Sequence, residues 1–221
     1  MQPQAPLFDH QPNEQVRVVF IGAGPGAADL ITLRGLRRLR EAEVVLFDAL
    51  TDPALRDEAP SADWVDVGKR GFSTSSTGQA RINALLVEHA QRSSRVVRLK
   101  GGDPSVFGRL EEELEALRAA GISCEVVPGI TSALAAAAAT QRPLTRRGVG
   151  RSVAFSTAMT QTGELQARRS ADTEVFYMAG RQLAAMAEKL GIPDDWDVMI
   201  VGDGCGCWWD AACGWGCILI D

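Results

Sequence analysis

The sequence predicts an α/β protein of two lobes, each a mainly parallel sheet flanked by helices. Short apolar strands alternate with helical segments from Arg17 to Val127, and parallel strands need such crossover helices. A second alternation follows a basic, turn-rich connector at residues 142–151. We therefore expect a first lobe at residues 16–141 and a second lobe at residues 152–221.

Apolar runs that end in a loop or turn are expected to form the strands of the first lobe, at residues 17–21, 44–47, 64–67, 95–99 and 123–127. Leu33, Leu36 and Leu39 recur at helical spacing after the first of these strands. Asp29 and Thr32 precede that run, and either side chain can cap the helix.

Three further helices are expected in the first lobe, at residues 79–92, 110–120 and 132–140. Gly121 ends the second of them, at the position where a left-handed residue is favoured. The elements expected in the second lobe are strands at residues 152–156, 174–178 and 198–201 and a helix at residues 182–190.

The end of the chain differs in composition from the rest. Four cysteines and three tryptophans gather there: Cys205, Cys207, Cys213, Cys217, Trp208, Trp209 and Trp215. Cysteine, tryptophan and glycine are what G-rich codons encode in a wrong reading frame. We therefore expect a frameshifted or broken end after about residue 204 that leaves the second sheet incomplete, with an open edge. A metal site is the alternative, although the cysteine spacing matches none of the common paired ligand patterns.

Charge and hydropathy exclude several classes of protein. The net charge of −5 argues against a general nucleic-acid binder, which is normally basic. No apolar run approaches the ~20 residues that a membrane helix needs. Residues 1–15 are polar and lack the apolar region of a signal peptide, so we expect a disordered leader and a cytoplasmic protein. His10 and His89 are too few for a convincing histidine-based metal site or Ser-His-Asp triad.

Three glycine-containing loops follow apolar strands, at Gly22–Gly26, Gly101–Pro104 and Pro128–Ser132. Because open α/β sheets bind ligands at the carboxyl ends of their strands, the three loops predict one composite small-molecule site. The first loop also nominally fits the dinucleotide fingerprint, with Asp48 ending the next strand. Its Pro25 delays the helix and leaves few amides for a pyrophosphate. An NAD(P) dehydrogenase and a turn without a ligand remain the alternatives.

Seven segments match one known family in order and spacing: VVFIGAGPGAADLITL (18–33), VVLFDAL (44–50), VGKR (67–70), VVRLKGGDPSVFGR (96–109), VVPGITS (126–132), PLTR (143–146) and FYMAG (176–180). On these segments the chain resembles the tetrapyrrole methylase family from Arg17 to Gly204. The resemblance implies methyl transfer from S-adenosylmethionine to pyrrole carbons of a tetrapyrrole, by a homodimer. It leaves open which member of the family this is, and whether the atypical end has left a binding remnant without activity.

The resemblance also assigns a cofactor site. The positions that match cofactor contacts are Pro25, Gly101, Gly102, Asp103, Val106, Thr131, Ser132, Met178 and Gly204. Asp103 offers acceptor oxygens, and Thr131 and Ser132 offer hydroxyl groups. Met178 is flexible and apolar enough to lie against adenine, and would otherwise be interpreted as a core methionine.

Asp48 matches the family's proposed proton acceptor, and Lys69 its proposed proton donor. Without the resemblance, Asp48 is interpreted as a helix cap or a ribose-binding aspartate, and Lys69 as a solvated lysine or one that attracts substrate carboxylates. We expect those carboxylates to pair with Lys100, Arg146 and Arg147. No metal is expected.

Overall fold

The computed structural model describes residues 16–68, 78–157, 170–178, 183–190, 198–202 and 216–220. Its contacts divide the chain into two units, the first comprising Met1–Ala23 and Ile31–Gly129 and the second Gly24–Leu30 and Ile130–Asp221. The second unit thus begins before the predicted connector and takes in the helix at residues 132–140. The predicted leader at residues 1–15 lies outside the described residues.

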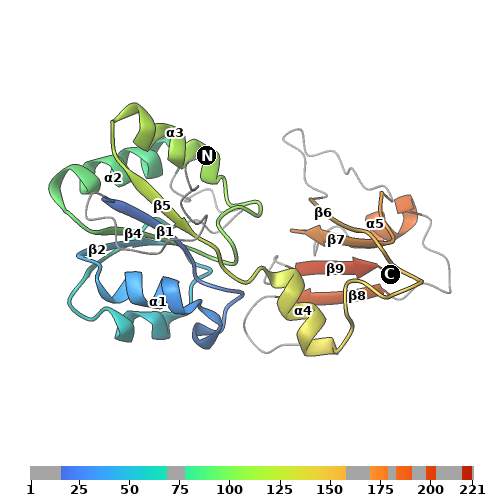
Figure 1. The fold of residues 1–221 in the computed structure, drawn as a ribbon. Helices are drawn as coiled ribbons and strands as arrows, with labels where there is room; N and C mark the ends of the chain where they lie inside the picture. Colours follow the sequence, from blue (N-terminus) through green and yellow to red (C-terminus); the bar gives the residue numbers. More distant parts are fainter. Residues whose placement is uncertain are drawn as a thin grey trace, which may run out of the picture. The chain divides into compact units, whose positions relative to one another are not determined.

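The sheet of the first unit has five parallel strands in the order β3-β2-β4-β1-β5. They are β1 (Val18–Gly22), β2 (Val44–Phe47), β3 (Asp63–Asp66), β4 (Val96–Lys100) and β5 (Cys124–Val127). Each predicted strand of the first lobe is present, within one residue of its expected bounds. Because β4, β1 and β5 are neighbours, the loops that follow them leave the sheet at one edge (Figure 1).

Helices cover both faces of this sheet, with α1 on one face and α2 and α3 on the other (Figure 1). Their bounds are α1 Leu33–Arg40, α2 Gln79–Arg92 and α3 Leu110–Ala119, and a 3₁₀ helix, η2, spans Pro53–Glu58. Thr32, rather than Asp29, caps α1, because its Oγ1 accepts a hydrogen bond from the N–H of Gly35 at 3.1 Å. Gly121 follows α3 with φ +68°, as predicted for the residue that ends this helix.

The core of the first unit lies between the sheet and α2. Alternate residues of β1 and β2 point to the same face, and residues four apart on α2 meet them. The buried side chains of this layer are Val18, Phe20, Val44, Leu46, Ile82, Leu86 and Ala90. This packing fixes the strand ends, and with them the loops that carry the glycines.

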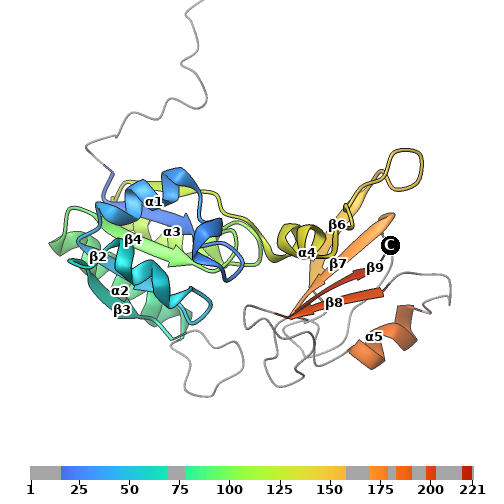
Figure 2. The same ribbon diagram turned by 90° about the horizontal axis from the view of Figure 1, so that it is seen from below.

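The second unit holds a four-stranded sheet in the order β6-β7-β9-β8, whose strands lie side by side in Figure 2. The bounds are β6 Val153–Thr157, β7 Thr173–Tyr177, β8 Val198–Gly202 and β9 Gly216–Ile220. Its helices are α4 (Ser132–Thr140) and α5 (Leu183–Leu190), with a 3₁₀ helix, η1, at Ala28–Leu30.

The second lobe is an α/β unit as predicted, but two details of its sheet differ from the expectation. Its sheet is mixed, since β6 and β7 are parallel but β9 runs antiparallel to both β7 and β8. The atypical tail also supplies a strand, because β9 lies between β7 and β8. The sequence Gly-Cys-Ile-Leu-Ile has the β-branched, apolar composition of a buried strand, a signal that the cysteines and tryptophans before it obscured.

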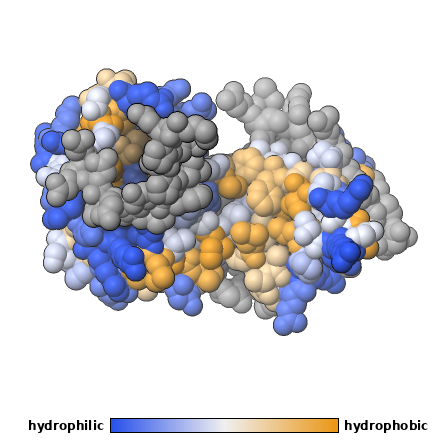
Figure 3. Space-filling model, in the orientation of Figure 1, coloured by the Kyte–Doolittle hydropathy of each residue, from blue (hydrophilic) through white to orange (hydrophobic). Residues whose placement is uncertain are grey.

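Large hydrophobic side chains reach the surface of the second unit, where Figure 3 shows hydrophobic residues gathered. Leu134 on α4, Val149 in the turn before β6, and Phe155 on β6 are each more than a third exposed. Among the described residues, no helix has the length and apolar character needed to cross a membrane.

Candidate functional site

Three glycines from different loops meet in the first unit at the carboxyl ends of β1, β4 and β5. A Cβ atom on Gly22 would lie 2.5 Å from the Cα of Gly129 and 2.7 Å from the carbonyl oxygen of Gly102. These distances are too short for any side chain, so the backbones themselves are in contact. The glycine loops therefore come together, as predicted. Main-chain groups rather than side chains lie at this edge of the sheet.

Asp103 connects two of these loops. Its Oδ2 accepts a hydrogen bond from the N–H of Gly129 at 2.8 Å, and its Oδ1 accepts one from the N–H of Ser105, also at 2.8 Å. The N–H of Val106 donates to the carbonyl oxygen of Asp103 at 3.2 Å and tightens the same turn. The carboxylate predicted to contact the cofactor therefore also fixes the shape of the loop. A carboxylate oxygen can accept more than one hydrogen bond, so this role leaves acceptor capacity for a ligand.

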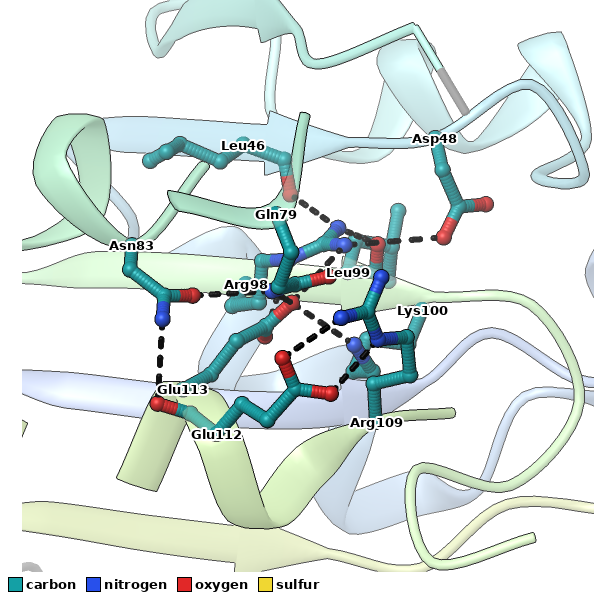
Figure 4. Close-up of polar contacts among 10 residues, drawn as sticks. All are labelled: Leu46, Asp48, Gln79, Asn83, Arg98, Leu99, Lys100, Arg109, Glu112 and Glu113. Atoms are coloured by element: carbon teal, nitrogen blue, oxygen red, sulfur yellow. Dashed lines mark hydrogen bonds and ion pairs between the residues drawn. The ribbon is translucent and has the colours of Figure 1, made fainter. Parts of the chain in front are cut away.

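Asp48 directly follows β2 and is only 7% exposed. Its Oδ1 accepts a hydrogen bond from the N–H of Leu50 at 3.2 Å, and the side chain of Leu50 packs on Gly101, where a Cβ would lie 2.6 Å from that of Leu50. Its Oδ2 lies 3.7 Å from Nη2 of Arg98 (Figure 4). The predicted proton acceptor is thus held by a tight turn on one side and faces a guanidinium on the other.

Behind Asp48 lies a buried ionic cluster formed by Arg98, Lys100 and Glu113, whose side chains are at most 4% exposed. Glu113 on α3 accepts from Nε of Arg98 at 3.2 Å and from Nζ of Lys100 at 3.0 Å. Nε2 of Gln79 on α2 also donates to Glu113, at 3.2 Å (Figure 4). The cluster itself holds two basic side chains and one carboxylate, and Asp48 is the second carboxylate beside it.

The pKa values of this cluster follow from its geometry. Burial lowers the pKa of Lys100 from 10.5 to about 8; repulsion by Arg98 adds to this, while attraction to Glu113 and Asp48 opposes it. Burial by itself raises the pKa of Glu113, but attraction to Arg98 and Lys100 and hydrogen bonds from Lys100 and Gln79 outweigh it and hold this pKa below its usual value. Glu113 is therefore ionised at neutral pH, whereas Lys100 lies close to losing its proton.

Arg98, Glu113 and Gln79 belong to this site but were not predicted from the sequence. A signal was available, because Arg98 interrupts an apolar strand at the centre of the sheet and a buried arginine needs a partner. Glu113 likewise lies at helical spacing from Leu110 and Leu117, on the apolar side of α3.

The predicted substrate-binding residues differ in their exposure to solvent. Lys100 is 3% exposed and its ammonium binds Glu113 inside the first unit, so it does not present its charge at the surface. Arg146 and Arg147 are exposed, in a turn closed by paired backbone hydrogen bonds between Arg146 and Gly150, each 2.9 Å. Lys69 lies outside the described residues.

In the second unit, Thr131 is buried as the N-cap residue of α4, and its Oγ1 lies 2.7 Å from the hydroxyl of Tyr177. Met178 follows Tyr177 directly and has φ +58°, a conformation that costs free energy in a residue with a side chain. Tyr177 was missed, although it is the one tyrosine of the chain and precedes Met178. The remaining cofactor candidates here, Pro25 and Ser132, are partly buried, and Gly204 lies outside the described residues.

No group of three or more histidine, cysteine, aspartate or glutamate side chains is placed to hold a metal ion within the described part of the chain. Cys205, Cys207 and Cys213 lie outside that part, and Cys217 belongs to β9.

The chain is similar to proteins of known activity over most of its length. It is 46% identical over 178 residues to a uroporphyrinogen-III C-methyltransferase of Pseudomonas aeruginosa, covering 79% of this chain and 72% of that protein. It is 43% identical over 206 residues to a siroheme synthase of Salmonella arizonae, covering 90% of this chain but 45% of that protein. The chain thus spans about half the length of the siroheme synthase that it matches.

Solved structures give the same result. The uroporphyrin-III C-methyltransferase of Thermus thermophilus, solved with S-adenosylhomocysteine, has a TM-score of 0.75 and 33% identity, covering 92% of this chain and 96% of that one. A cobalt precorrin-4 methyltransferase has a TM-score of 0.76 at 24% identity, covering 95% of this chain and 97% of that one, and shares the fold. Residues 17–207 match the model of the tetrapyrrole (corrin/porphyrin) methylases. The chain therefore belongs to the tetrapyrrole methylase family.

Proposed function

We propose that this chain is an S-adenosylmethionine-dependent C-methyltransferase that converts uroporphyrinogen III to precorrin-2 through precorrin-1, a step toward sirohaem and cobalamin. The observation that carries the proposal is the contact of Gly22, Gly102 and Gly129 beside the buried carboxylate of Asp48. The 46% identity to a uroporphyrinogen-III C-methyltransferase selects this substrate among those of the family.

The residues of the first unit fit a small ligand that binds against main chain. An edge where no Cβ can be added lets a ligand approach backbone N–H and C=O groups closely. S-adenosylmethionine supplies a methyl group on a positively charged sulfur. We assign its binding to Gly101, Gly102, Asp103 and Val106 in the first unit, and to Pro25, Thr131, Ser132, Met178 and Gly204 in the second.

We assign proton acceptance to Asp48. When a ring carbon takes the methyl group, a new C–C bond would form as the bond between that methyl group and the sulfur breaks; the electron pair would go to the sulfur, S-adenosylhomocysteine would leave, and the ring would be positively charged. The ring then loses a proton, and the electrons of the broken bond to hydrogen neutralise it. Asp48 is suited to take that proton because its Oδ1 is held by the N–H of Leu50, while its Oδ2 faces Arg98 at 3.7 Å, beyond hydrogen-bond distance.

The other parts of the proposal rest on the family resemblance. Lys69 is the proposed proton donor, and the exposed Arg146 and Arg147 are the proposed partners of the substrate carboxylates. Lys100 is left out of this set because its ammonium is bound to Glu113. A homodimer and a cytoplasmic location complete the proposal.

The test is incubation with S-adenosylmethionine and uroporphyrinogen III generated enzymatically, followed by absorbance and mass. We expect a product two methyl groups heavier. Binding of S-adenosylhomocysteine without methyl transfer to any tetrapyrrole supports a binding remnant, and transfer to a later corrinoid alone supports another methylase of the family. Micromolar NADP binding, with no heat from the methyl donor, contradicts the assignment.

A further inference from the structure

Glu113 is a buried charge that the proposed reaction does not use directly. It lies on the side of α3 that carries Leu110 and Leu117 and is fully buried. An ionised carboxylate in such a place is costly unless it is paired, and its removal leaves its partners unpaired. Its partners Arg98 and Lys100 both lie on β4, the strand that leads into the loop with Gly101 and Gly102.

The guanidinium of Arg98 is shared between Glu113 and the surroundings of Asp48. Its Nε and Nη2 donate to Glu113 at 3.2 and 3.4 Å, and its Nη1 donates to the carbonyl oxygens of Leu99 at 2.9 Å and Leu46 at 3.4 Å. The same Nη2 lies 3.7 Å from Oδ2 of Asp48 (Figure 4). Since the guanidinium is planar, the bonds to Glu113 and the two carbonyl groups fix its orientation toward Asp48.

We propose that Glu113 is a positioning residue for the methyl transfer: it holds Arg98 in the orientation that faces Asp48 at 3.7 Å without closing onto it as a hydrogen-bonded, bidentate pair. This inference rests on the proposed function. The 3.7 Å separation matters because a carboxylate bound bidentately by arginine is a weaker base and less able to turn toward a substrate. Glu113 competes with Asp48 for the guanidinium and thereby keeps Asp48 available.

Lys100 makes the substitution of Glu113 feasible. The charged groups that face Lys100 are Arg98 on β4, Glu113 on α3 and Asp48 after β2. Of these, Glu113 raises the pKa of Lys100, which is already lowered to about 8, so loss of the Glu113 charge lowers it further. The variant then releases the lysine proton instead of burying two cations opposite one anion.

The central experiment compares Glu113→Gln, Glu113→Asp and Glu112→Gln in the full chain. Glu112 is the matched control, because it is the adjacent acidic residue and its ion pair with Arg109 is about half exposed. We expect kcat of Glu113→Gln to fall by about tenfold or more, with KM for the methyl donor within about twofold. The acid limb of its kcat profile moves to lower pH, since the freed Arg98 stabilises the ionised form of Asp48.

Glu113→Asp retains the charge, so the acid limb of its kcat profile should stay where it is in the parent. Glu112→Gln should match the parent in kcat, in KM and in the pH profile. The cofactor loop is held separately by Asp103, so affinity for S-adenosylhomocysteine is expected to persist in Glu113→Gln. A kcat within about twofold of the parent overturns the positioning role. The positioning role is also overturned if kcat falls while the acid limb of the pH profile stays in place and ligand affinity and melting temperature fall together with kcat. That pattern indicates a structural role only.

A second measurement does not depend on turnover. Lys69, Lys100 and Lys189 are the lysines of the chain, so Lys100 can be followed by NMR of ¹³C-labelled lysine. We expect its titration midpoint to be lower in Glu113→Gln than in the parent, and an unchanged midpoint overturns the electrostatic coupling. A parent that does not methylate overturns the proposed function and, with it, the role of Glu113 in turnover. If the parent methylates and Glu113→Gln is equally active, only the positioning role of Glu113 is overturned.

Discussion

Asp103 and Gly129 are joined by a 2.8 Å hydrogen bond from the backbone N–H of the glycine to Oδ2 of the carboxylate. The bond connects the loop after β4 to the loop after β5 across the point where a side chain on Gly22 would not fit. One side chain, acting on main chain, therefore joins two loops of the candidate site.

Asp103→Ala is expected to weaken S-adenosylhomocysteine binding by about tenfold to a hundredfold, since hydrogen bonds to a charged group contribute ~1.5–3 kcal/mol. The loss combines any contact with the ligand and the release of the loop that Asp103 holds. Calorimetric titration measures it. Asp52→Ala is the matched control, because Asp52 caps Ala54 at the start of η2 in the same way. Equal affinity in Asp103→Ala and the parent removes Asp103 from the site.

Asp48→Asn should reduce turnover by ~10²-fold or more while cofactor affinity is retained. Asparagine keeps the oxygen that accepts from Leu50 but cannot take a proton at neutral pH. Steady-state kinetics and calorimetry separate the two effects. Asp66→Asn is the control, because Asp66 accepts from the N–H of Gly68 two residues on, at an exposed strand end. Undiminished turnover identifies Asp48 as a cap only.

Gly22→Ala is expected to destabilise the first unit by about 1–3 kcal/mol, the usual cost of overpacking, because the new Cβ meets backbone that cannot move aside. Urea denaturation measures the free energy of unfolding. Gly78→Ala is the control, since a Cβ there meets nothing within 4 Å and the residue has φ −60°. Similar stability for both variants contradicts the contact among the three glycines.

Stability should rise with pH over the range in which Lys100 loses its proton. The pKa of Lys100 is about 8 in the folded chain and near 10.5 when exposed, so between these values the unfolded chain holds a proton that the folded chain has released. The unfolding free energy therefore increases across this pH range, by on the order of 3 kcal/mol at most. Below this pH range, Lys100 is charged in the folded chain and the full cost of burying that charge is present.

Lys100→Met removes this group, so the difference in unfolding free energy between parent and variant reports Lys100 alone. We expect that difference to move in favour of the parent as pH rises from about 8 to 10.5. A difference that is constant with pH shows that Lys100 keeps its proton in the folded chain.

The tail is expected to contribute a strand rather than a metal site. Deletion of residues 216–221 removes β9 from between β7 and β8, so hydrogen exchange at β7 and β8 amides should become much faster. Changing Cys205, Cys207, Cys213 and Cys217 together to serine should leave methyl transfer unchanged. Stoichiometric zinc or iron, lost together with the fold in that variant, would instead identify the tail as a metal-binding module.

The sequence by itself determined the strands and helices of the first lobe. Its apolar runs are bounded by glycines, prolines and charged residues, so local periodicity and turn chemistry were sufficient for β1 to β5. The motifs around Gly101, Thr131 and Met178 identified the family for the same reason, because each is a short contiguous segment. Asp48 and Asp103 could be selected from their places at the ends of strands.

Only the tertiary structure decided which groups meet. Glu113 lies fifteen residues from Arg98 along the chain, and their ion pair forms because α3 packs over β4. The same packing turns Lys100 inward, against the expectation that it faces substrate. Strand β9 was missed because its pairing with β7 joins residues more than forty positions apart, such as Phe176 and Ile218. Such contacts depend on how elements stack, which no local pattern encodes.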